Sequence, residues 1–243
     1  MSTASALSAA LNNAAWCDAV CRAAGGTTEF TAMLWRNAVP SPAYFPNVIT
    51  IDADVKLAAV EVALRKVSVK GPQVGVKDSF RTLNLALIGF SKLFEASWIW
   101  REPESPRFTS MQLAWTKIDS FANLQAWELA WWPEEPSPAP HPAIFGPTLL
   151  DCGNISFLAG HEGTALVAGA SITETEDVVG LACTFFRGPN PEQQRRELLS
   201  VLRNRYPGRG IVSYESEDEL LVMRELGFRE IGPLCVWLSP APS

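Results

Sequence analysis

The sequence predicts an α/β protein built around a mixed β-sheet, and three observations lead to this fold class. Apolar runs of strand length alternate with segments whose apolar residues have helical spacing. The order strand, helix, strand, helix, strand recurs, and it is typical of sheets that contain parallel neighbours. Hydrophobic residues make up 47% of the 243 residues and charged residues 19%, so the chain can bury a sizeable core.

The C-terminal segment carries the clearest pattern. Periodicity predicts, in order, a strand over 178–186, a helix over 190–205, a strand over 211–214, a helix over 217–226 and a strand over 234–238. The last helix is closed by Gly227-Phe228, because glycine readily adopts the left-handed conformation found after a helix C-terminus.

The middle of the chain adds a strand, a helix and a hairpin. Ser120 is suited to cap the helix because a serine side chain accepts a hydrogen bond from the first turn. The pattern predicts a strand over 111–118, a helix over 120–132, a proline-rich loop over 133–142, a strand over 154–159, a turn over 161–163 and a strand over 165–173.

The N-terminal segment mixes helices with short strands. We expect helices over 5–24, 29–37, 55–67 and 80–88, and strands over 48–51, 74–76 and 93–100. Residues 74–101 and 212–239 share the order strand, polar turn, helix, Gly-Phe, strand. Aligned without gaps, Gly89-Phe90 meets Gly227-Phe228, which indicates an internal repeat. Since any βαβ unit shares this order, coincidence stays open as the alternative.

Composition excludes several classes of function. A net charge of -6 and scattered Lys and Arg argue against a nucleic-acid partner, which needs a basic face. No apolar run has the roughly 20 residues that span a membrane, and residues 1–15 lack the features of a signal peptide, so we expect a cytoplasmic protein. Five cysteines, an odd number, fit reduced thiols. Cys17 and Cys21 lie one helical turn apart, but without a nearby His a metal site is not expected.

The element order over residues 108–238, with Gly227-Phe228 after the last helix, resembles the GNAT superfamily of acetyltransferases. The resemblance implies a cofactor, acetyl-CoA, and N-acetylation of a small-molecule or peptide amine. With the repeat, it also implies a tandem in which residues 1–103 form a truncated GNAT-like half and residues 104–243 a GNAT-like domain. A homodimer is a further expectation.

In the family, the strand corresponding to 178–186 splays from its neighbour and the pyrophosphate binds a glycine-rich loop at the next helix. Helix N-termini favour phosphate because their N–H groups are unpaired. The resemblance therefore assigns cofactor contacts to Phe185, Phe186, Arg187, Gly188 and Asn190. This loop departs from the family's pattern, since it has one glycine and two prolines and Glu192 adds negative charge. The alternative is an ordinary strand-to-helix loop.

The family's usual general acid is a Tyr four residues before the glycine of Gly-Phe. Here that position is Met223, and in the first half it is Leu85, so neither can protonate a leaving thiolate. Tyr214 and Glu215 end the strand at 211–214, where α/β clefts form, and we predict them as substitute acid and base. The alternative is that Tyr214 packs and Glu215 caps the next helix.

Two further interpretations stay open. Lys77 and Asp78 follow the strand at 74–76, where they would form a pair in a cleft between the two halves. The alternative is that Asp78 or Ser79 caps the N-terminus of the helix predicted from Phe80. The whole chain is then either an acyl-CoA-dependent N-acetyltransferase, with a backbone N–H near 184–186 stabilising the oxyanion, or a GNAT-like ligand- or protein-binding module without catalysis.

Overall fold

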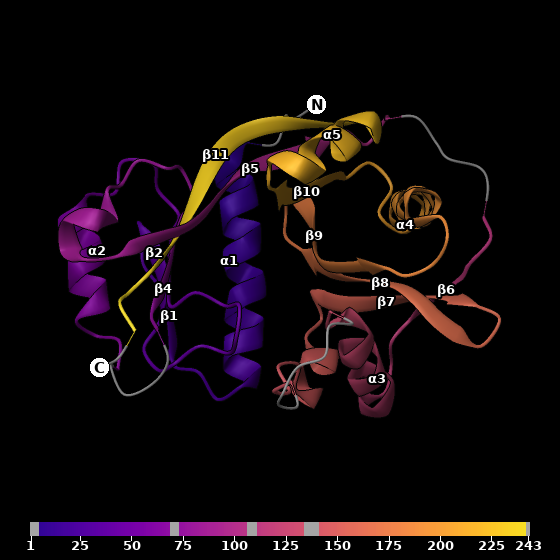
Figure 1. The fold of residues 1–243 in the computed structure, drawn as a ribbon, viewed down its shortest axis with the longest axis horizontal. Coiled ribbons are helices and arrows are strands. Elements are labelled where there is room, and N and C mark those ends of the chain that lie inside the picture. Colours follow the sequence, from indigo (N-terminus) through magenta and orange to yellow (C-terminus); the bar gives the residue numbers. More distant parts are fainter. Residues whose placement is uncertain (1–4, 69–72, 106–110, 134–140, 242–243) are drawn as a thin grey trace.

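A computed structural model describes residues 5–68, 73–105, 111–133 and 141–241. The helices are α1 (Ala6–Ala23), α2 (Leu57–Leu64), α3 (Phe121–Trp131), α4 (Pro191–Arg205) and α5 (Glu217–Glu225), with short 3-10 helices η1 (Leu85–Ile88) and η2 (Pro147–Asp151). The strands are β1 (Thr28–Phe30), β2 (Leu34–Asn37), β3 (Val48–Thr50), β4 (Gly75–Asp78), β5 (Ser91–Arg101), β6 (Ala114–Lys117), β7 (Ile155–Glu162), β8 (Ala165–Glu174), β9 (Val178–Phe186), β10 (Gly210–Glu215) and β11 (Phe228–Leu238). This arrangement confirms a mixed α/β fold (Figure 1).

Within the described residues, the strands form one 11-stranded sheet in the order β1-β2-β3-β4-β11-β5-β10-β9-β8-β7-β6. The pairs β3–β4 and β9–β10 are parallel, and every other neighbouring pair is antiparallel. Helix α2 joins the first parallel pair and α4 joins the second. On each side of the central pair of β11 and β5 a parallel pair therefore comes first and antiparallel strands follow, with four strands on the β4 side and five on the β10 side.

Each of the two central strands pairs with strands of the other proposed half. β5 pairs with β10 as well as with β11, and β11 pairs with β4 as well as with β5. Gly89 and Gly227, which precede these strands, have left-handed φ values of 84° and 87°. The shared order supports an internal repeat, and the repeat itself stays a prediction. So does a domain boundary near residue 103, because the sheet takes strands from both sides of it.

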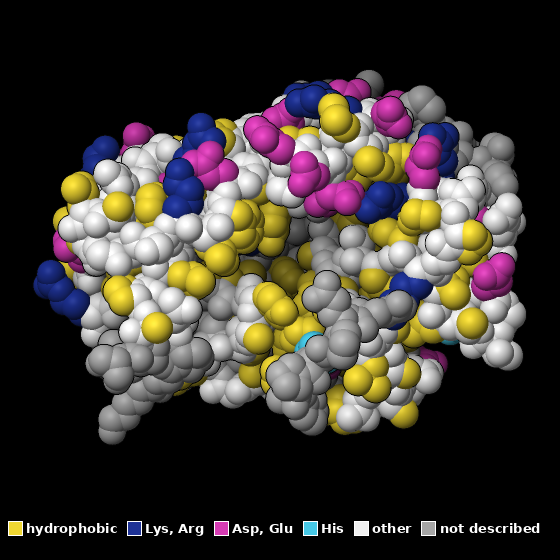
Figure 2. Space-filling model, viewed as in Figure 1, with side chains coloured by type: hydrophobic (Ala, Val, Ile, Leu, Met, Phe, Trp, Pro, Cys, Tyr) yellow, Lys and Arg dark blue, Asp and Glu magenta, His cyan; other side chains and the backbone are white. Residues whose placement is uncertain are grey.

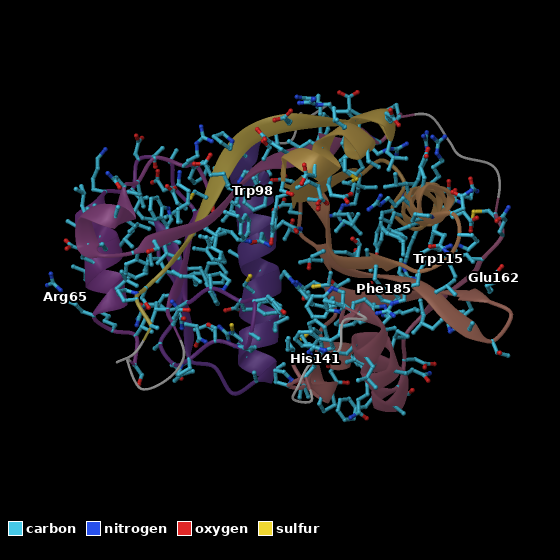
Figure 3. The ribbon with its side chains drawn as sticks, viewed as in Figure 1. Arg65, Trp98, Trp115, His141, Glu162 and Phe185 are labelled. Carbon is cyan, nitrogen blue, oxygen red and sulfur yellow. The ribbon has the colours of Figure 1, made fainter. Side chains whose placement is uncertain are left out.

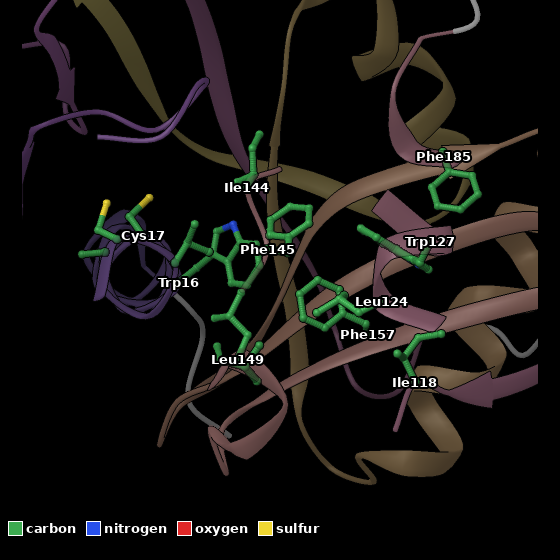
Figure 4. Packing of buried hydrophobic residues seen from close by; sticks show 14 of the residues in the cluster. Trp16, Cys17, Ile118, Leu124, Trp127, Ile144, Phe145, Leu149, Phe157 and Phe185 are labelled. Atoms are coloured by element: carbon green, nitrogen blue, oxygen red, sulfur yellow. The ribbon is translucent and has the colours of Figure 1, made fainter. Parts of the chain in front are cut away.

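Helices cover both faces of the sheet. α1 and α3 pack on one face, where Trp16, Trp127, Phe145 and Phe157 form the centre of an aromatic core (Figure 4). α4 and α5 pack on the opposite face of β7–β10, since neighbouring strand residues divide between the two cores. None of the helices in the described part of the chain is long and apolar enough to cross a membrane.

Two predicted helices are wrong. Residues 29–37 form a hairpin of β1 and β2, because the Thr31 hydroxyl accepts hydrogen bonds from the backbone N–H groups of Met33 and Leu34 and turns the chain. All four residues of β2 are buried, so their apolar spacing could not distinguish a strand from a helix.

The helix predicted over 80–88 is reduced to η1. The Asp78 carboxylate accepts hydrogen bonds from the N–H groups of Phe80 and Leu83, at 3.3 and 2.8 Å, and Arg81 has a left-handed φ of 53°. Asp78 therefore stabilises a turn and does not cap a helix that begins at Phe80. The helices at Ser5 and Ser120 are confirmed, and both serine side chains accept a hydrogen bond from the first turn.

The buried carboxylate of Glu197 links α4 by hydrogen bonds to the residues just before β6. Glu197 is fully buried and accepts hydrogen bonds from the N–H groups of Gln112 and Leu113, both at 2.9 Å. Hydrogen bonds to a charged acceptor contribute more than neutral ones, and stranded buried donors are costly.

Replacing Glu197 by Ala is therefore expected to lower the free energy of unfolding by about 2–3 kcal/mol. Urea unfolding measures this as a lower midpoint with an unchanged slope. Glu192→Ala on the same helix is the matched control, since its carboxylate is half exposed and forms a surface ion pair with Arg196. Equal midpoints for the two variants would contradict the role given to Glu197.

Candidate active site

The strands β9 and β10 separate after a short parallel contact. Their paired residues are Gly210 with Val178, Ile211 with Val179 and Val212 with Gly180, and pairing stops there. The remainder of β9, up to Phe186, and the end of β10 therefore diverge. This divergence confirms the expected gap in the sheet, and α4 begins five residues after β9 ends.

A bulge in β9 lies at the gap. The register with β8 shifts between Gly169 and Ser171, so that Cys183 and Thr184 together oppose Ala170. Cys183 has a left-handed φ of 48°, which is uncommon for a residue with a side chain. A bulge leaves an extra residue outside the ladder and bends its strand. The backbone near Thr184 is thus placed to offer an N–H group to the gap.

A pocket of about 220 Å³ opens from the gap on the side of α4 and α5, and we call it the α4 pocket. Apolar and polar side chains both line it, and its charged residues are Arg195, Glu215 and Glu219. The Arg195 guanidinium lies 5.1 Å from the centre of the Phe186 ring and is 2.8 Å from the Glu219 carboxylate. Met223, at the position of the family's usual acid, is buried and lines this pocket.

A second pocket of about 240 Å³ lies on the α1 side, and we call it the α1 pocket. Asn13, Trp16 and Cys17 of α1 form one wall, and the ends of β9 and β10 form another. Lys77 and Trp131 complete it from β4 and α3. The hollow near the centre of Figure 2, with hydrophobic side chains in it, lies where α1 faces β9 in Figure 1.

The two pockets meet where the strands diverge. Leu181, Thr184 and Glu215 line both of them. The α4 pocket belongs to one face of the sheet and the α1 pocket to the other, so the gap connects them through the sheet. Two reactants that enter from opposite faces would meet beside Glu215.

Glu215 has the electrostatics of a base that works near neutral pH. Burial and, to a smaller extent, the nearby Glu219 carboxylate together raise the pKa of its carboxyl from the usual value of 4.5 to about 7. Arg195 and a hydrogen bond from the Ser213 hydroxyl, at 3.5 Å, oppose this rise in the pKa. A carboxyl with this pKa accepts a proton readily at pH 7 and above.

Tyr214 is positioned by packing. Its ring makes an edge contact with Trp98, with ring centres 5.5 Å apart, and the Lys77 ammonium lies 4.1 Å from its centre. Trp98, labelled in Figure 3, also packs against the N-terminal half of α1. Tyr214 also lines the α1 pocket, so it both packs against its neighbours and lies at the candidate site. Its role as a general acid stays a prediction.

The predicted phosphate loop is largely occupied by its own contacts. The Arg187 guanidinium donates to the carbonyl of Trp132, and the Asn190 side chain accepts from the N–H of Gln193 at 3.1 Å. Gly188 has a φ of 155°, and its neighbour across the loop is the Gln194 amide. Phe186 faces the α4 pocket, whereas Phe185 packs on Trp127 in the opposite core. Cofactor contacts by these residues stay a prediction.

Thiol and metal chemistry find little support. Burial raises the pKa of the Cys17 thiol and of the Cys183 thiol to about 12, so both are unreactive, as expected of core cysteines. All five cysteines are free. The described residues contain no group of three or more His, Cys, Asp or Glu side chains that could hold a metal ion.

Sequence reasoning missed the contribution of α1 and of Arg195. α1 precedes β9 by more than a hundred residues in the chain, and its apolar spacing indicates only that one face is buried. Arg195 is one of several charged residues of α4, and only the packing against Phe186 distinguishes it. Lys77 was noted as a strand-end residue, but its partner is not Asp78.

Together, the sheet order, the divergence of β9 and β10 and the connecting helices define the fold of the GNAT N-acetyltransferases. A GCN5-related N-acetyltransferase from Kribbella flavida superposes with a TM-score of 0.64 at 13% identity, covering 96% of each chain. A conserved protein of unknown function from Staphylococcus epidermidis gives 0.62 at 11% identity, over 89% of this chain and 95% of that one.

A structure from Novosphingobium aromaticivorans, assigned to the GNAT family of acetyltransferases, gives a TM-score of 0.55 at 15% identity, over 92% of this chain and 97% of that one. At such identities the likeness concerns the fold. No protein-family model matches the sequence, and no curated protein matches it.

Proposed function

We propose that this protein transfers an acyl group from acetyl-CoA to the amine of a small molecule or peptide. The observation that carries the proposal is the meeting of two pockets from opposite faces of the sheet at Thr184 and Glu215. The α4 pocket would hold the acyl donor and the α1 pocket the amine. Holding both reactants at one point supplies much of the rate enhancement of a bimolecular reaction.

The chemistry follows from the groups at the gap. Glu215 takes one proton from the acceptor's ammonium group, and the freed nitrogen bonds to the acyl carbon while the carbon–sulfur bond breaks. The second proton of the amine goes to the leaving sulfur, so the products are an amide and a thiol. A backbone N–H of the bulge near Thr184 stabilises the negative charge on the acyl oxygen during the transfer.

The residues present fit one end of acetyl-CoA better than the other. The apolar residues of the α4 pocket, such as Phe186 and Leu198, would contact the acyl group and its flexible arm. The start of α4 offers little to a pyrophosphate, since Asn190 already caps it and Pro191 lacks an N–H. The first turn of α5 adds Glu217, Asp218 and Glu219, part of the acidic side chains seen over α5 in Figure 2. The phosphates would therefore depend on arginine side chains.

Arg187→Ala is expected to weaken acetyl-CoA binding by about 1–3 kcal/mol, the range for a hydrogen bond to a charged group. Calorimetry on the wild type and the variant measures this. Arg65→Ala is the matched control, since Arg65 is exposed and lies at the far end of the molecule from α4 (Figure 3). Tight binding that is unaffected by Arg187→Ala would move the phosphate site toward Arg195.

The competing function is a binding module without catalysis. Met223 in place of an acid and the capped start of α4 favour it. An assay for thiol release, with acetyl-CoA and a set of amines, separates the two functions. Thiol release that depends on the amine supports acyl transfer. Binding of acetyl-CoA without thiol release supports the binding module without catalysis. Absence of acetyl-CoA binding, measured as an unchanged melting temperature, overturns the transfer.

A further inference from the structure

Lys77 carries a buried charge that has no counter-ion among the described residues. Its side chain is 4% exposed, and its ammonium donates a hydrogen bond to the Asn13 side-chain oxygen at 2.8 Å. Its other partners are the rings of Tyr214 and Trp98, whose centres lie 4.1 and 5.8 Å away. Among the described residues, no carboxylate lies within 4 Å of this ammonium. Burying a charge is costly unless it is paired, so a negatively charged group of a ligand would be stabilised next to Lys77.

The α1 pocket places this cation in one cavity with an anion. Lys77 comes from β4 and Glu215 from β10, and both line the pocket. Two strands, β11 and β5, lie between them in the sheet, so the two charges stand at separate places on the wall. A ligand complementary to this arrangement carries a negative group toward Lys77 and an amine toward Glu215.

The rest of the pocket selects the body of such a ligand. Trp16, Tyr44, Phe45 and Trp131 present aromatic surface to it. The pocket's volume of about 240 Å³ lies below the roughly 300–1,000 Å³ of pockets for drug-sized ligands. A small molecule with an apolar portion fits these walls, and a long polar chain does not.

We propose that the acyl acceptor is a free amino acid with an apolar side chain, bound through its carboxylate to Lys77. The proposal rests on the acyl transfer proposed above and names its acceptor. The ligand's carboxylate supplies the counter-ion that Lys77 lacks, the aromatic residues contact the ligand's side chain, and Glu215 receives a proton from the amine. The carboxylate completes a charge-assisted hydrogen bond, which is stronger than a neutral one.

Calorimetry tests the proposal in the absence of turnover, with and without coenzyme A. The probes are leucine, methionine, phenylalanine and tryptophan, each compared with its carboxamide, which keeps the amine and the side chain but lacks the carboxylate. We expect at least one amino acid to bind at least ten-fold more tightly than its carboxamide. Lys77→Met, which keeps the length and apolar stem, is expected to abolish this preference.

Lys117→Met is the matched control, because Lys117 is an exposed lysine on the distant edge strand β6 and should leave the preference unchanged. Equal binding of amino acids and carboxamides by the wild type, or no binding of either, overturns the proposal even if Lys77→Met fails to fold. A preference that survives Lys77→Met also overturns it. If amino acids bind but no acyl group is transferred, the Lys77 site stands and the proposed acyl transfer is wrong. If acyl transfer occurs only to amines without a carboxylate, the acyl transfer stands and the Lys77 site is wrong.

Discussion

Glu215→Gln is expected to lower kcat for amide formation by about 10²–10⁴-fold, the usual contribution of a general base. The amide keeps the size of the side chain and cannot accept the proton. For the wild type, kcat/KM should rise with pH through a pKa near 7, because burial raises the pKa of this carboxyl to about 7 and only the ionised form is a base. Steady-state kinetics across pH on both proteins measure the two effects.

Glu217→Gln is the control for this substitution, since Glu217 is an exposed carboxylate in the first turn of α5. It should leave kcat and the pH profile unchanged. A Glu215→Gln protein that keeps both the rate and the pH dependence of the wild type would remove Glu215 from the chemistry. Tyr214 would then be the next residue to replace.

The same pKa has a consequence for stability. The folded protein holds the proton of Glu215 more tightly than the unfolded chain, whose pKa lies near the usual value of 4.5. The folded state is therefore disfavoured progressively as the pH rises from that value through about 7. Glu215→Gln removes this term, so its melting temperature should exceed that of the wild type at pH 8, and the difference should shrink toward pH 4.

Trp127→Ala is expected to lower the free energy of unfolding by about 3–5 kcal/mol, as for other buried aromatic residues. Trp127 is fully buried, and its ring makes edge contacts with Phe145, Phe157 and Phe185 at centre distances of 5.1–5.8 Å. Its indole N–H also donates to the carbonyl of Leu158 at 2.8 Å, and the substitution removes this hydrogen bond.

Urea unfolding measures this loss, and Leu129→Ala on the same helix is the control. Leu129 is 70% exposed, so its truncation should change the free energy of unfolding by less than about 0.5 kcal/mol. A loss below about 1 kcal/mol for Trp127→Ala would mean that the aromatic core repacks around the vacated space.

The sequence predicted the elements of this fold better than their pairing. The strands and helices from 154 to 238 are found where periodicity and the Gly227 stop placed them, because these signals are local. The hairpin at β1–β2 was missed because its strands have only three and four residues and β2 is buried on both faces, so neither shows a clear alternation. No local signal indicated that β11 would enter between β4 and β5, since pairing partners are chosen by tertiary packing.

In the candidate site too, local features could be predicted from the sequence, whereas features that depend on tertiary packing could not. Glu215 was predicted from its place at the end of a strand, and the structure puts it in both pockets. The raised pKa of Glu215 follows from Glu219 and from burial, neither of which sequence spacing reveals. The wall formed by α1 depends on a contact between distant segments, as does the bulge at Cys183, which has no sequence signature.

The pairing of β5 and β11 with strands of the other half also bears on how the protein is made. During synthesis the strands up to Arg101 leave the ribosome long before Phe228–Leu238. Until β11 is made, the edges of β4 and β5 that pair with it have no partner. Exposed edges of this kind invite pairing with other chains. Neither segment can complete its sheet alone, so a break in the loop between them would yield two fragments that depend on each other for folding. We therefore expect the interval between synthesis of β5 and of β11 to be the stage at which the nascent chain is most prone to aggregate.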